Sequence, residues 1–525
     1  MKRSDSCWLD KTLTDLLREN VEKNPDAPAI EWGDIILSHA ELDLKSDRLA
    51  AGLARWGIGK GDVVSCQLPN IPEFLILHQA VSKRRAIFNP IHMPYRSSEV
   101  EHMLSFADST MLVVGPPVKD FSYLEMGLEM QQGLPSLRHV VSLGVEAGQG
   151  SIPWEELAHE SAKAQEEDPQ PQDPFLLLFT SGTTASPKAT LHTHNMRMSN
   201  SWFCGKDMGL RTSDAMLCCS ALSHMWAILN YWSSVIYGCR QVLLERYRPS
   251  TFPSRLAQGR ATVVIGAPVH AIDLLASPDL TPDDLPGLRL FALSGSVCSP
   301  DLVGKLRKTL KHCTPVVFWG MTETGGGFYT RLDDPPEVIE NTAGRVSGAC
   351  VIAVRDDQGK TLPPHQEGDL VIQTPFGIKS YFKNPKATQE SFTSDGWFRT
   401  GDLAKMDSAG NVQILGRRKE EINRGGAKFL PESVEEVILR HPAVYRAAIV
   451  GMPDERLGER AVCFVVPVQG KAPPILEELC ALLEQDGTAK FKWPERLEIV
   501  ESLPLTPTGK IQRAVLRASP EYAWK

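Results

Sequence analysis

The sequence predicts an α/β protein in which a large N-terminal domain, built of mixed or parallel sheets with helices, is hinged to a small C-terminal α+β domain. Three observations predict this fold class. The chain has 525 residues, which is too long for one ordinary core. Short apolar runs of strand length alternate with helical patterns along most of the chain. A basic, glycine-containing segment at 416–426 precedes a smaller unit that begins afresh.

The first elements follow from apolar spacing. Four apolar residues fall on one helical face, and Asn24-Pro25 closes that run: Leu13, Leu16, Leu17 and Val21. The apolar runs at 63–64, 74–81 and 111–114 then have the spacing of strands and helices in βαβ units, which favours a largely parallel sheet. The acidic, proline-rich stretch QEEDPQPQDP at 165–174 predicts a surface linker before a buried strand at 175–179.

The segment GRRKEEINRGG at 416–426 marks the boundary between the two domains. It carries four basic residues and no apolar periodicity. We therefore expect a large domain over 1–417 and a small, mobile domain over 418–525. Within the small domain, Pro431 opens a helix whose apolar face holds Val434, Val437 and Ile438, and the runs at 447–450 and 461–468 predict strands.

Composition excludes several classes of protein. With 42% apolar and 23% charged residues the chain has a normal soluble composition, and a net charge of −8 gives no electrostatic footprint for nucleic acid or an anionic membrane. No segment approaches the length of a membrane span, and the N-terminus lacks a signal-like apolar run. Eleven scattered cysteines without metal-ligand spacing predict reduced thiols in a cytoplasmic protein. We expect the protein to be a monomer or a homodimer.

The stretch FLLLFTSGTTASPKATLHTHN at 175–195 carries the first chemical signal. A buried strand ends there in small donors followed by a cation, at the edge where open α/β sheets place their ligands. Backbone N–H groups, hydroxyls and a lysine together suit the phosphates of a nucleotide, although the Walker pattern is absent and a polar turn is the plain alternative. The candidate residues are Thr180, Ser181, Gly182, Thr183, Thr184 and Lys188.

Three further motifs add candidates of the same kind. WGMTETGGG follows an apolar run and offers Glu323 to hold Mg²⁺ and Trp319 to stack on a base. Asp402 in GWFRTGD and Arg417 in GRRK have side chains suited to ribose hydroxyls. Lys510 stands between Gly509 and an apolar residue in LPLTPTGKIQR. Taken singly, each motif has a structural alternative: a capped loop, a capped turn or a solvated lysine.

In this order and spacing the motifs resemble the acyl-adenylate-forming enzymes, which include acyl-CoA synthetases, beetle luciferases and the adenylation domains of peptide synthetases. The resemblance covers nearly the whole chain, and the sequence is most like that of a stand-alone acyl-CoA synthetase. It is carried by ELDLKSDRLAAGLARWGIGKGDVVSCQLPNIPEF, TSGTTASPKA, ALSH, LSGSV, WGMTET, GDLVIQTPFGIKSYFKNPKAT, GWFRTGD, GRRKEEINRGG and FKWPERLEIVESLPLTPTGKIQR.

The resemblance implies that a carboxylate attacks the α-phosphate of ATP, that pyrophosphate leaves and that the small domain then swings to admit an acceptor. It places Thr322 on the α-phosphate, Glu323 on Mg²⁺, Asp402 and Arg417 on the ribose, and Lys510 between the carboxylate and the α-phosphate. Lys419 takes the hinge position and His224 the gate of the acyl pocket. The residues expected to flank the adenine or bind the nucleotide nearby are Ser294, Gly295, Ser296, Trp319, Gly320 and Met321.

The acceptor is left open by departures from the family pattern. Ser433 stands where the family tends to have glutamate, in the loop that meets the acceptor, and Ala185, Ala189 and Ser380 replace usual glycines. Arg84 and Arg85 stand where the family has small residues. The first hypothesis is transfer to CoA. The alternatives are transfer to an amino-acid amine, transfer to a separate carrier protein, or a non-catalytic adenylate-binding module.

The candidate residues of the acyl pocket indicate only the general chemistry of the carboxylic acid. These residues are apolar and favour a hydrophobic or cyclic acid: Met225, Trp226, Leu229 and Val264. His192 and His194 form an HxH pair, for which we expect no metal because a histidine near this loop is common in the family.

Overall fold

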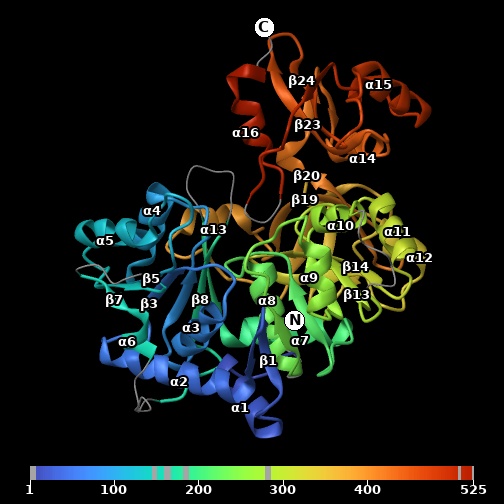
Figure 1. Ribbon diagram of the computed structural model, residues 1–525. Helices are drawn as coiled ribbons and strands as arrows, with labels where there is room; N and C mark the ends of the chain where they lie inside the picture. Colours follow the sequence, from blue (N-terminus) through green and yellow to red (C-terminus); the bar gives the residue numbers. More distant parts are fainter. Residues whose placement is uncertain are drawn as a thin grey trace.

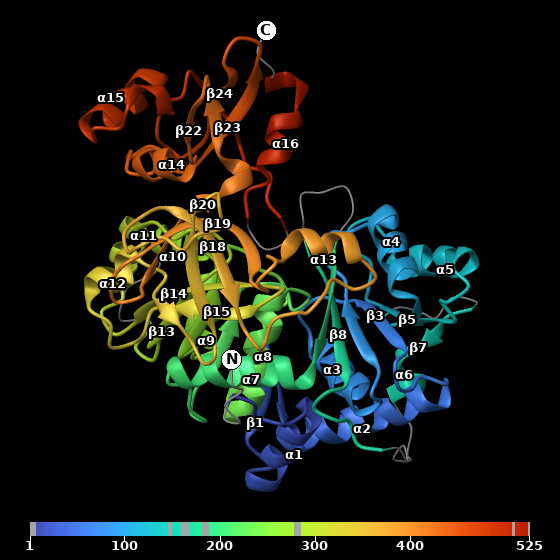
Figure 2. The same ribbon diagram turned by 180° about the vertical axis from the view of Figure 1, so that it is seen from behind.

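The computed structural model describes residues 7–144, 150–158, 167–180, 188–277, 285–506 and 510–522. The chain forms a large lobe, whose last strand is β20 (Val412–Arg417), and a small lobe, whose first strand is β21 (Ile422–Arg424). The small lobe sits above one end of the large lobe in Figure 1 and Figure 2. This mixed α/β architecture confirms the predicted fold class. No helix among the described residues is both long and apolar enough to cross a bilayer.

The first sheet of the large lobe has seven strands in the order β7-β6-β5-β3-β4-β8-β9. All its neighbouring strands are parallel except β8 and β9, which form an antiparallel pair. Its strands are β3 (Val63–Gln67), β4 (Ile87–Pro90), β5 (Ser109–Val114), β6 (His139–Ser142), β7 (Ile152–Pro153), β8 (Pro174–Phe179) and β9 (Ala189–Thr193). The parallel sheet and the buried strand after the acidic linker are thereby confirmed.

Six helices connect or flank these strands: α1 (Leu13–Lys23), α2 (His39–Arg55), α3 (Pro72–Lys83), α4 (Ser97–Ala107), α5 (Tyr123–Gly133) and α6 (Trp154–Ala158). Helix α1 confirms the first apolar face, and Thr12 caps it by accepting from Asp15 N at 3.1 Å. Helix α3 differs from an amphipathic helix because nearly its whole length is buried, so its apolar residues are not confined to one face.

The second sheet has nine strands in the order β16-β15-β14-β13-β12-β10-β11-β1-β2. Parallel pairing runs from β1 through β14, whereas β2, β15 and β16 are antiparallel additions at the two edges. Its strands are β1 (Pro28–Trp32), β2 (Ile35–Ser38), β10 (Ala215–Cys218), β11 (Arg240–Val242), β12 (Val263–Gly266), β13 (Leu290–Leu293), β14 (Thr314–Met321), β15 (Gly325–Tyr329) and β16 (Arg345–Val346).

The helices associated with this part of the chain are α7 (His194–Asp207), α8 (Met225–Tyr237), α9 (Phe252–Gln258), α10 (Pro268–Leu275), α11 (Pro300–Thr309) and α12 (Pro336–Asn341). A third, antiparallel sheet completes the large lobe with β17 (Val351–Arg355), β18 (Gly368–Gln373), β19 (Phe398–Met406) and β20 (Val412–Arg417), together with helix α13 (Pro385–Ser391). Strand β20 ends at Arg417, directly before the short helix η2 (Arg418–Glu420) that enters the small lobe.

The small lobe contains one sheet in which β25 (Arg496–Ile499) pairs in parallel with β24 (Gly458–Pro467). The other strands, β21 (Ile422–Arg424), β22 (Ala427–Phe429) and β23 (Val444–Asp454), pair in antiparallel fashion. Helices α14 (Glu432–Ile438), α15 (Leu476–Gln485) and α16 (Arg513–Ala518) accompany it. The predicted helix after Pro431 and both predicted strands are confirmed.

Each hydrophobic cluster of the described residues lies within one lobe. The clusters of the large lobe include residues only up to Val412, and those of the small lobe begin at Ile422. Each lobe therefore has its own core, and apolar burial does not fix how the lobes are oriented.

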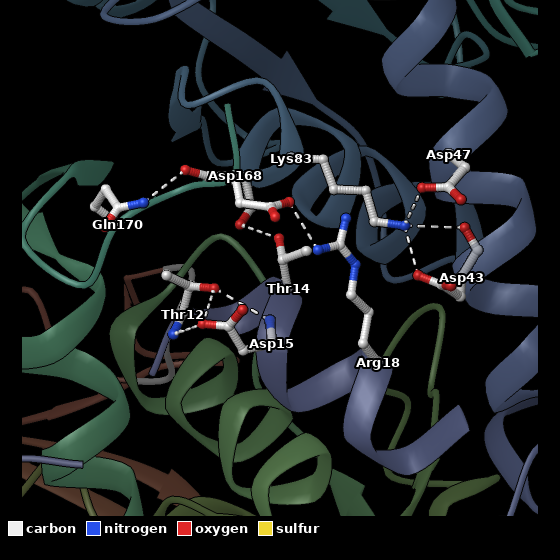
Figure 3. Close-up of polar contacts among 10 residues, drawn as sticks. Thr12, Thr14, Asp15, Arg18, Asp43, Asp47, Lys83, Asp168 and Gln170 are labelled. Carbon is white, nitrogen blue, oxygen red and sulfur yellow. Dashed lines mark hydrogen bonds and ion pairs between the residues drawn. The ribbon is translucent and has the colours of Figure 1, made fainter. Parts of the chain in front are cut away.

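The two arginines that depart from the family pattern serve structure in the large lobe. Arg84 donates to the carbonyl of Ile58 at 2.9 Å from Nε, and Arg85 pairs with Asp173 and Glu167 in the acidic linker. The preceding Lys83 Nζ points to Asp43 and Asp47 at 2.6 and 2.8 Å, as Figure 3 shows. These pairs fasten the linker and helix α2 to the end of helix α3.

A candidate active site between the lobes

A cavity of about 1190 Å³ lies between the two lobes and is lined by residues of both. It brings together most of the residues that the sequence predicted for the site: Thr180, His224, Ser294, Gly295, Ser296, Trp319, Gly320, Met321, Thr322, Glu323, Asp402, Arg417 and Lys510. Ser181, Gly182, Thr183 and Thr184 lie outside the described residues, as does Ala185. The cavity is wide enough for a nucleotide together with a small acid.

Two neighbouring parallel strands deliver the large-lobe side of this cavity. Strand β13 ends at Leu293, immediately before Ser294–Ser296, and its neighbour β14 ends at Met321, immediately before Thr322 and Glu323. Carboxyl ends of adjacent parallel strands meet at one edge of a sheet, which explains why these distant segments converge. Trp319, Gly320 and Met321 are the last three residues of β14 and precede the loop that follows the strand.

Trp319, Asp402 and Arg417 form a connected polar group. The indole Nε1 of Trp319 donates to Asp402 Oδ2 at 2.9 Å, and Arg417 Nε contacts Asp402 Oδ1 at 2.8 Å. One face of the indole stacks on Phe328, with ring centroids 4.5 Å apart. Burial raises the pKa of Asp402, while the Arg417 guanidinium and the indole N–H oppose that rise. Both oxygens of this buried carboxylate are thus held in place from two strands.

Glu323 is held by a residue that motif reading did not select as a site residue. The hydroxyl of Tyr381 donates to Glu323 Oε1 at 2.8 Å, and Glu323 is 7% exposed. Burial and the nearby carboxylate raise the pKa of Tyr381, which keeps it a donor. Lys188 Nζ lies over the Tyr381 ring, 4.9 Å from its centroid. Tyr381 therefore connects the lysine of the phosphate-binding motif to the candidate metal ligand, and its only sequence signal was an aromatic residue after Ser380.

His224 caps helix α8 at the cavity. Its Nδ1 accepts from Trp226 N at 3.3 Å, and its ring lies 6.2 Å from that of His92, whose Nδ1 is 2.7 Å from Ser223 Oγ. Burial lowers the pKa of His224 well below its usual value, and the positive charge of Lys510 lowers it further. His224 is thus a neutral imidazole at neutral pH, and His92 is a neighbour that no motif revealed.

Lys510 reaches the large lobe from the small lobe. A methyl group added at Gly295 would lie 3.7 Å from Lys510 Cε, so the lysine stem passes directly over this glycine, whose φ is +98°. The loop that carries it is closed by Thr506 N donating to Lys510 O at 2.7 Å. Burial lowers the pKa of Lys510, as does Arg417, whereas Asp402 and Glu323 raise it. The charge of the lysine is therefore placed among the groups predicted to surround the nucleotide.

The residues present fit a magnesium ion that is shared with phosphate oxygens. Glu323 supplies a hard carboxylate ligand beside the Thr322 hydroxyl, which suits an ion that keeps several waters and binds through one or two carboxylates. Among the described residues, no group of three or more His, Cys, Asp or Glu side chains is arranged to hold a metal ion by itself.

The HxH pair and the acyl-pocket residues also have defined places. His192 Nε2 lies 3.0 Å from Thr190 Oγ1, and His194 accepts from Leu13 N at 3.3 Å, so the two rings take part in separate contacts of the core. Met225, Trp226 and Leu229 line the cavity. Val264, the fourth predicted pocket residue, lies in β12 within a hydrophobic cluster.

Comparison with known proteins identifies the family of the chain. The model of the AMP-binding enzyme family matches residues 17–382, and the model of the AMP-binding enzyme C-terminal domain matches residues 433–510. The chain is 33% identical over 518 residues to the 2,3-dihydroxybenzoate-AMP ligase of Bacillus subtilis, covering 98% of this chain and 95% of that protein.

The names of two further similar proteins indicate different acyl acceptors. The chain is 30% identical over 525 residues to the medium-chain fatty-acid–CoA ligase of Escherichia coli, covering 98% of this chain and 91% of that protein. It also superposes on the amide bond synthetase McbA of Marinactinospora thermotolerans with a TM-score of 0.83 and 26% identity, covering 96% of this chain and 99% of that one. The chain belongs to the acyl-adenylate-forming superfamily of AMP-binding enzymes.

Proposed function

We propose that this protein activates a hydrophobic or cyclic carboxylic acid with ATP, releases pyrophosphate and passes the acyl group of the acyl-AMP to the thiol of CoA. The observation that carries the first step is Lys510, which extends from the small lobe into a cavity lined by Glu323, Asp402 and Arg417. The apolar side chains of Met225, Trp226 and Leu229 in the same cavity support a hydrophobic or cyclic acid.

In the first step a carboxylate oxygen of the acid attacks the α-phosphorus of ATP and the bond to the pyrophosphate oxygen breaks. Negative charge develops on the phosphoryl oxygens, and the fixed charge of Lys510 stabilises it. Thr322 binds the α-phosphate, while Lys188 with Thr180 and the adjoining residues 181–184 holds the leaving pyrophosphate. Mg²⁺, when bound at Glu323, neutralises phosphate charge.

The remaining assignments come from the resemblance to the family, and the lining of the cavity supports them. Asp402 and Arg417 hold the ribose, and Trp319 with Ser294–Ser296 and Gly320–Met321 flanks the adenine. Trp319 and Arg417 already hold the Asp402 carboxylate in position, so this side chain needs little reorganisation before the nucleotide binds. His224, which is neutral, gates the acyl pocket without adding a charge that would compete for the carboxylate.

The second step requires the small lobe to turn so that Lys510 leaves and an acceptor enters. We place the boundary between residues 417 and 418 and the pivot at Lys419, within the short helix η2 that joins β20 to the small lobe. The thiol then attacks the acyl carbon and AMP leaves. The similarity to a CoA ligase over nearly the whole chain supports CoA as the acceptor.

The amide alternative is supported by the similarity to an amide bond synthetase, and transfer to a separate carrier protein is the third candidate. We keep CoA as the proposed acceptor and make the amine an outcome of the test.

The test is ATP–pyrophosphate exchange across a panel of acids, which holds benzoate, salicylate, 2,3-dihydroxybenzoate, octanoate, decanoate and several amino acids. We expect exchange with an aromatic or aliphatic hydrophobic acid and none with amino acids. Mass spectrometry of products formed with CoA, and separately with free amino acids, then identifies the acceptor. A thioester supports the proposal, whereas an amide without any thioester replaces CoA by an amine. Absence of exchange with every acid contradicts the proposed first step.

A further inference from the structure

Asp273 on helix α10 connects the two lobes at a point away from the hinge. This large-lobe residue is 5% exposed. Its Oδ2 accepts a hydrogen bond from the hydroxyl of Tyr247, also in the large lobe, at 2.8 Å. Its Oδ1 accepts from the hydroxyl of Tyr445 and, at 3.1 Å, from Nη2 of Arg446, both on strand β23 of the small lobe. One buried carboxylate thus binds donors from both lobes.

The same part of the large lobe also carries the segment that faces Lys510. Strand β12 ends at Gly266, whose carbonyl accepts from Ser294 N at 3.0 Å, and helix α10 starts two residues later at Pro268. The side chain of His270 fixes the start of α10 by accepting from Ala267 N at 2.8 Å. Asp273 is therefore connected through a short, hydrogen-bonded framework to Gly295, over which Lys510 passes.

A second attachment lies at the hinge end of the small lobe. Arg418 of η2 pairs with Asp369 at 2.5 Å and with Asp357 at 3.3 Å, both in the large lobe. The attachment at Arg418 alone would let the small lobe rotate about it. A second, separate attachment at Asp273 resists that rotation. Because each hydrophobic cluster of the described residues stays within one lobe, polar contacts of this kind carry much of the orientation between them.

The contact at Asp273 is built to be specific. The carboxylate side chain is 1% exposed and that of Arg446 is 20% exposed, so the pair is shielded from water. Hydrogen bonds to a charged group in such a setting are stronger than those between neutral groups. Burial, followed by the hydrogen bond to Asp273, raises the pKa of Tyr445 to about 12, which keeps its hydroxyl a donor.

We infer that Asp273 is a positioning residue for adenylation: by binding Tyr445 and Arg446 it holds the small lobe in the orientation that places Lys510 in the cavity. The inference rests on the proposed function only for what Lys510 does once it is there. The contact must open whenever the small lobe turns, so Asp273 also sets how much of the protein is found in the adenylating orientation.

The direct test measures the accessibility of Lys510 rather than activity. Acetylation of lysines by acetic anhydride is followed by mass spectrometry for the wild type, Asp273→Asn and Asp273→Ala, with Lys490 as the internal reference for an exposed lysine. We expect Lys510 to be labelled about tenfold faster in Asp273→Ala, with a smaller increase in Asp273→Asn, because hydrogen bonds to a charged group are lost. Tyr445→Phe and Arg446→Met should change labelling in the same direction.

A matched control separates positioning from general loss of stability. Asp214→Asn breaks a comparably buried carboxylate–arginine pair with Arg289, but both partners lie in the large lobe. We expect this variant to leave the labelling rate of Lys510 unchanged in the folded protein. Unchanged Lys510 labelling in both Asp273 variants, or equal acceleration in Asp214→Asn, overturns the inference.

Exchange kinetics supply the second readout. With an acid accepted by the wild type, we expect kcat of ATP–pyrophosphate exchange to fall about tenfold in Asp273→Ala while KM for the acid stays constant, because Met225, Trp226 and Leu229 belong to the large lobe. Faster labelling in a protein that exchanges with no acid leaves the positioning contact standing and removes the proposed function. Normal kcat in Asp273→Ala overturns the positioning role.

Discussion

One buried ionisable side chain from each lobe makes an instructive comparison. In the large lobe His78 packs against the rings of Phe88 and Phe175 and accepts from Trp232 Nε1 at 3.0 Å. Burial lowers the pKa of His78 to about 3, so the group is neutral. In the small lobe Arg513 binds both oxygens of Glu435 at 2.7 and 2.8 Å. His78 is thus kept neutral by its apolar surroundings, whereas the small lobe buries an arginine together with its carboxylates, a charged centre close to Lys510 in the chain.

The charged centre contains more carboxylates than arginines. Glu432 and Glu420 lie 3.4 and 3.5 Å from Arg513, which is three positions after Lys510 in the chain. Burial raises the pKa of Glu432 to about 7, and the neighbouring carboxylates add to that rise. Since Glu420 belongs to η2, one cluster connects the segment that joins the lobes, helix α14 and the segment after Lys510. The difference teaches that a buried ionisable group is kept neutral where apolar rings surround it and is kept charged where partners of opposite charge surround it.

Replacing Lys510 by alanine should give the largest effect. We expect Lys510→Ala to lower the rate of ATP–pyrophosphate exchange by about 10²–10³, because a fixed cation no longer meets the developing charge. The comparison predicts that the fold of both lobes survives, since Arg513 and its carboxylates remain. The matched control is Lys490→Ala, an exposed lysine of the same lobe. Exchange at the wild-type rate in Lys510→Ala removes this residue from the mechanism.

Replacing Arg513 tests the charged centre itself. Arg513→Met leaves Glu435 buried without its cation, and we expect the small lobe to lose about 3 kcal/mol of stability. Hydrogen exchange read by mass spectrometry should show faster exchange in β23 and β24 while β13 and β14 stay protected. Arg517→Met, which breaks the more exposed pair with Glu459, serves as the control and should cost less than about 1 kcal/mol. Parallel loss of protection in both lobes contradicts the separation of their cores.

Much of the fold was predictable because it follows local patterns, and the site was predictable where motifs follow strand ends. Helix α1, the buried strand before the phosphate-binding motif and the strands of the small lobe were all correct from apolar spacing. Asp402 and Lys510 were selected from short motifs, and the structure brings both to one cavity. Their roles toward ATP stay predictions.

What the sequence did not reveal depends on contacts between distant segments. Tyr381 reaches Glu323 across 58 positions, and Tyr445 reaches Asp273 across 172, so no local window contains either pair. Helix α3 departs from an amphipathic pattern because it is covered on all sides, a consequence of packing that periodicity alone does not encode.

Acid should lower the folding stability of the large lobe. The effect of each histidine is smaller than that of the substitutions above. Burial lowers the pKa of His78 and His194 to about 3 and that of His92 and His270 to about 4, from an ordinary 6.5. The unfolded chain binds more protons between these values, so stability falls as pH drops from about 6.5 to 4, by up to about 1.4 kcal/mol per pH unit for each histidine.

The small lobe should respond in the opposite sense. The pKa of Glu432 is raised from 4.5 to about 7 in the folded protein, so its contribution is fully present below 4.5 and is lost as pH rises through 7. Urea unfolding at pH 7.5 and pH 5, followed by hydrogen exchange in β3 and in β23, compares the lobes. We expect β3 to lose protection at pH 5 and β23 to gain relative to it. Glu432→Gln should remove the part of the pH response that lies in β23 and leave that of β3, and equal shifts in both strands of the wild type contradict the assignment.

Separate cores have a consequence for how such a molecule can change over generations. A substitution inside one lobe's interior is not felt by the interior of the other, so each lobe can drift at its own pace. Exchange of the small lobe for that of a relative then depends on matched polar partners between the lobes, among them Asp273 with Tyr445 and Arg446, and Arg418 with Asp369. This architecture therefore permits the small lobe to be exchanged as a unit between related proteins.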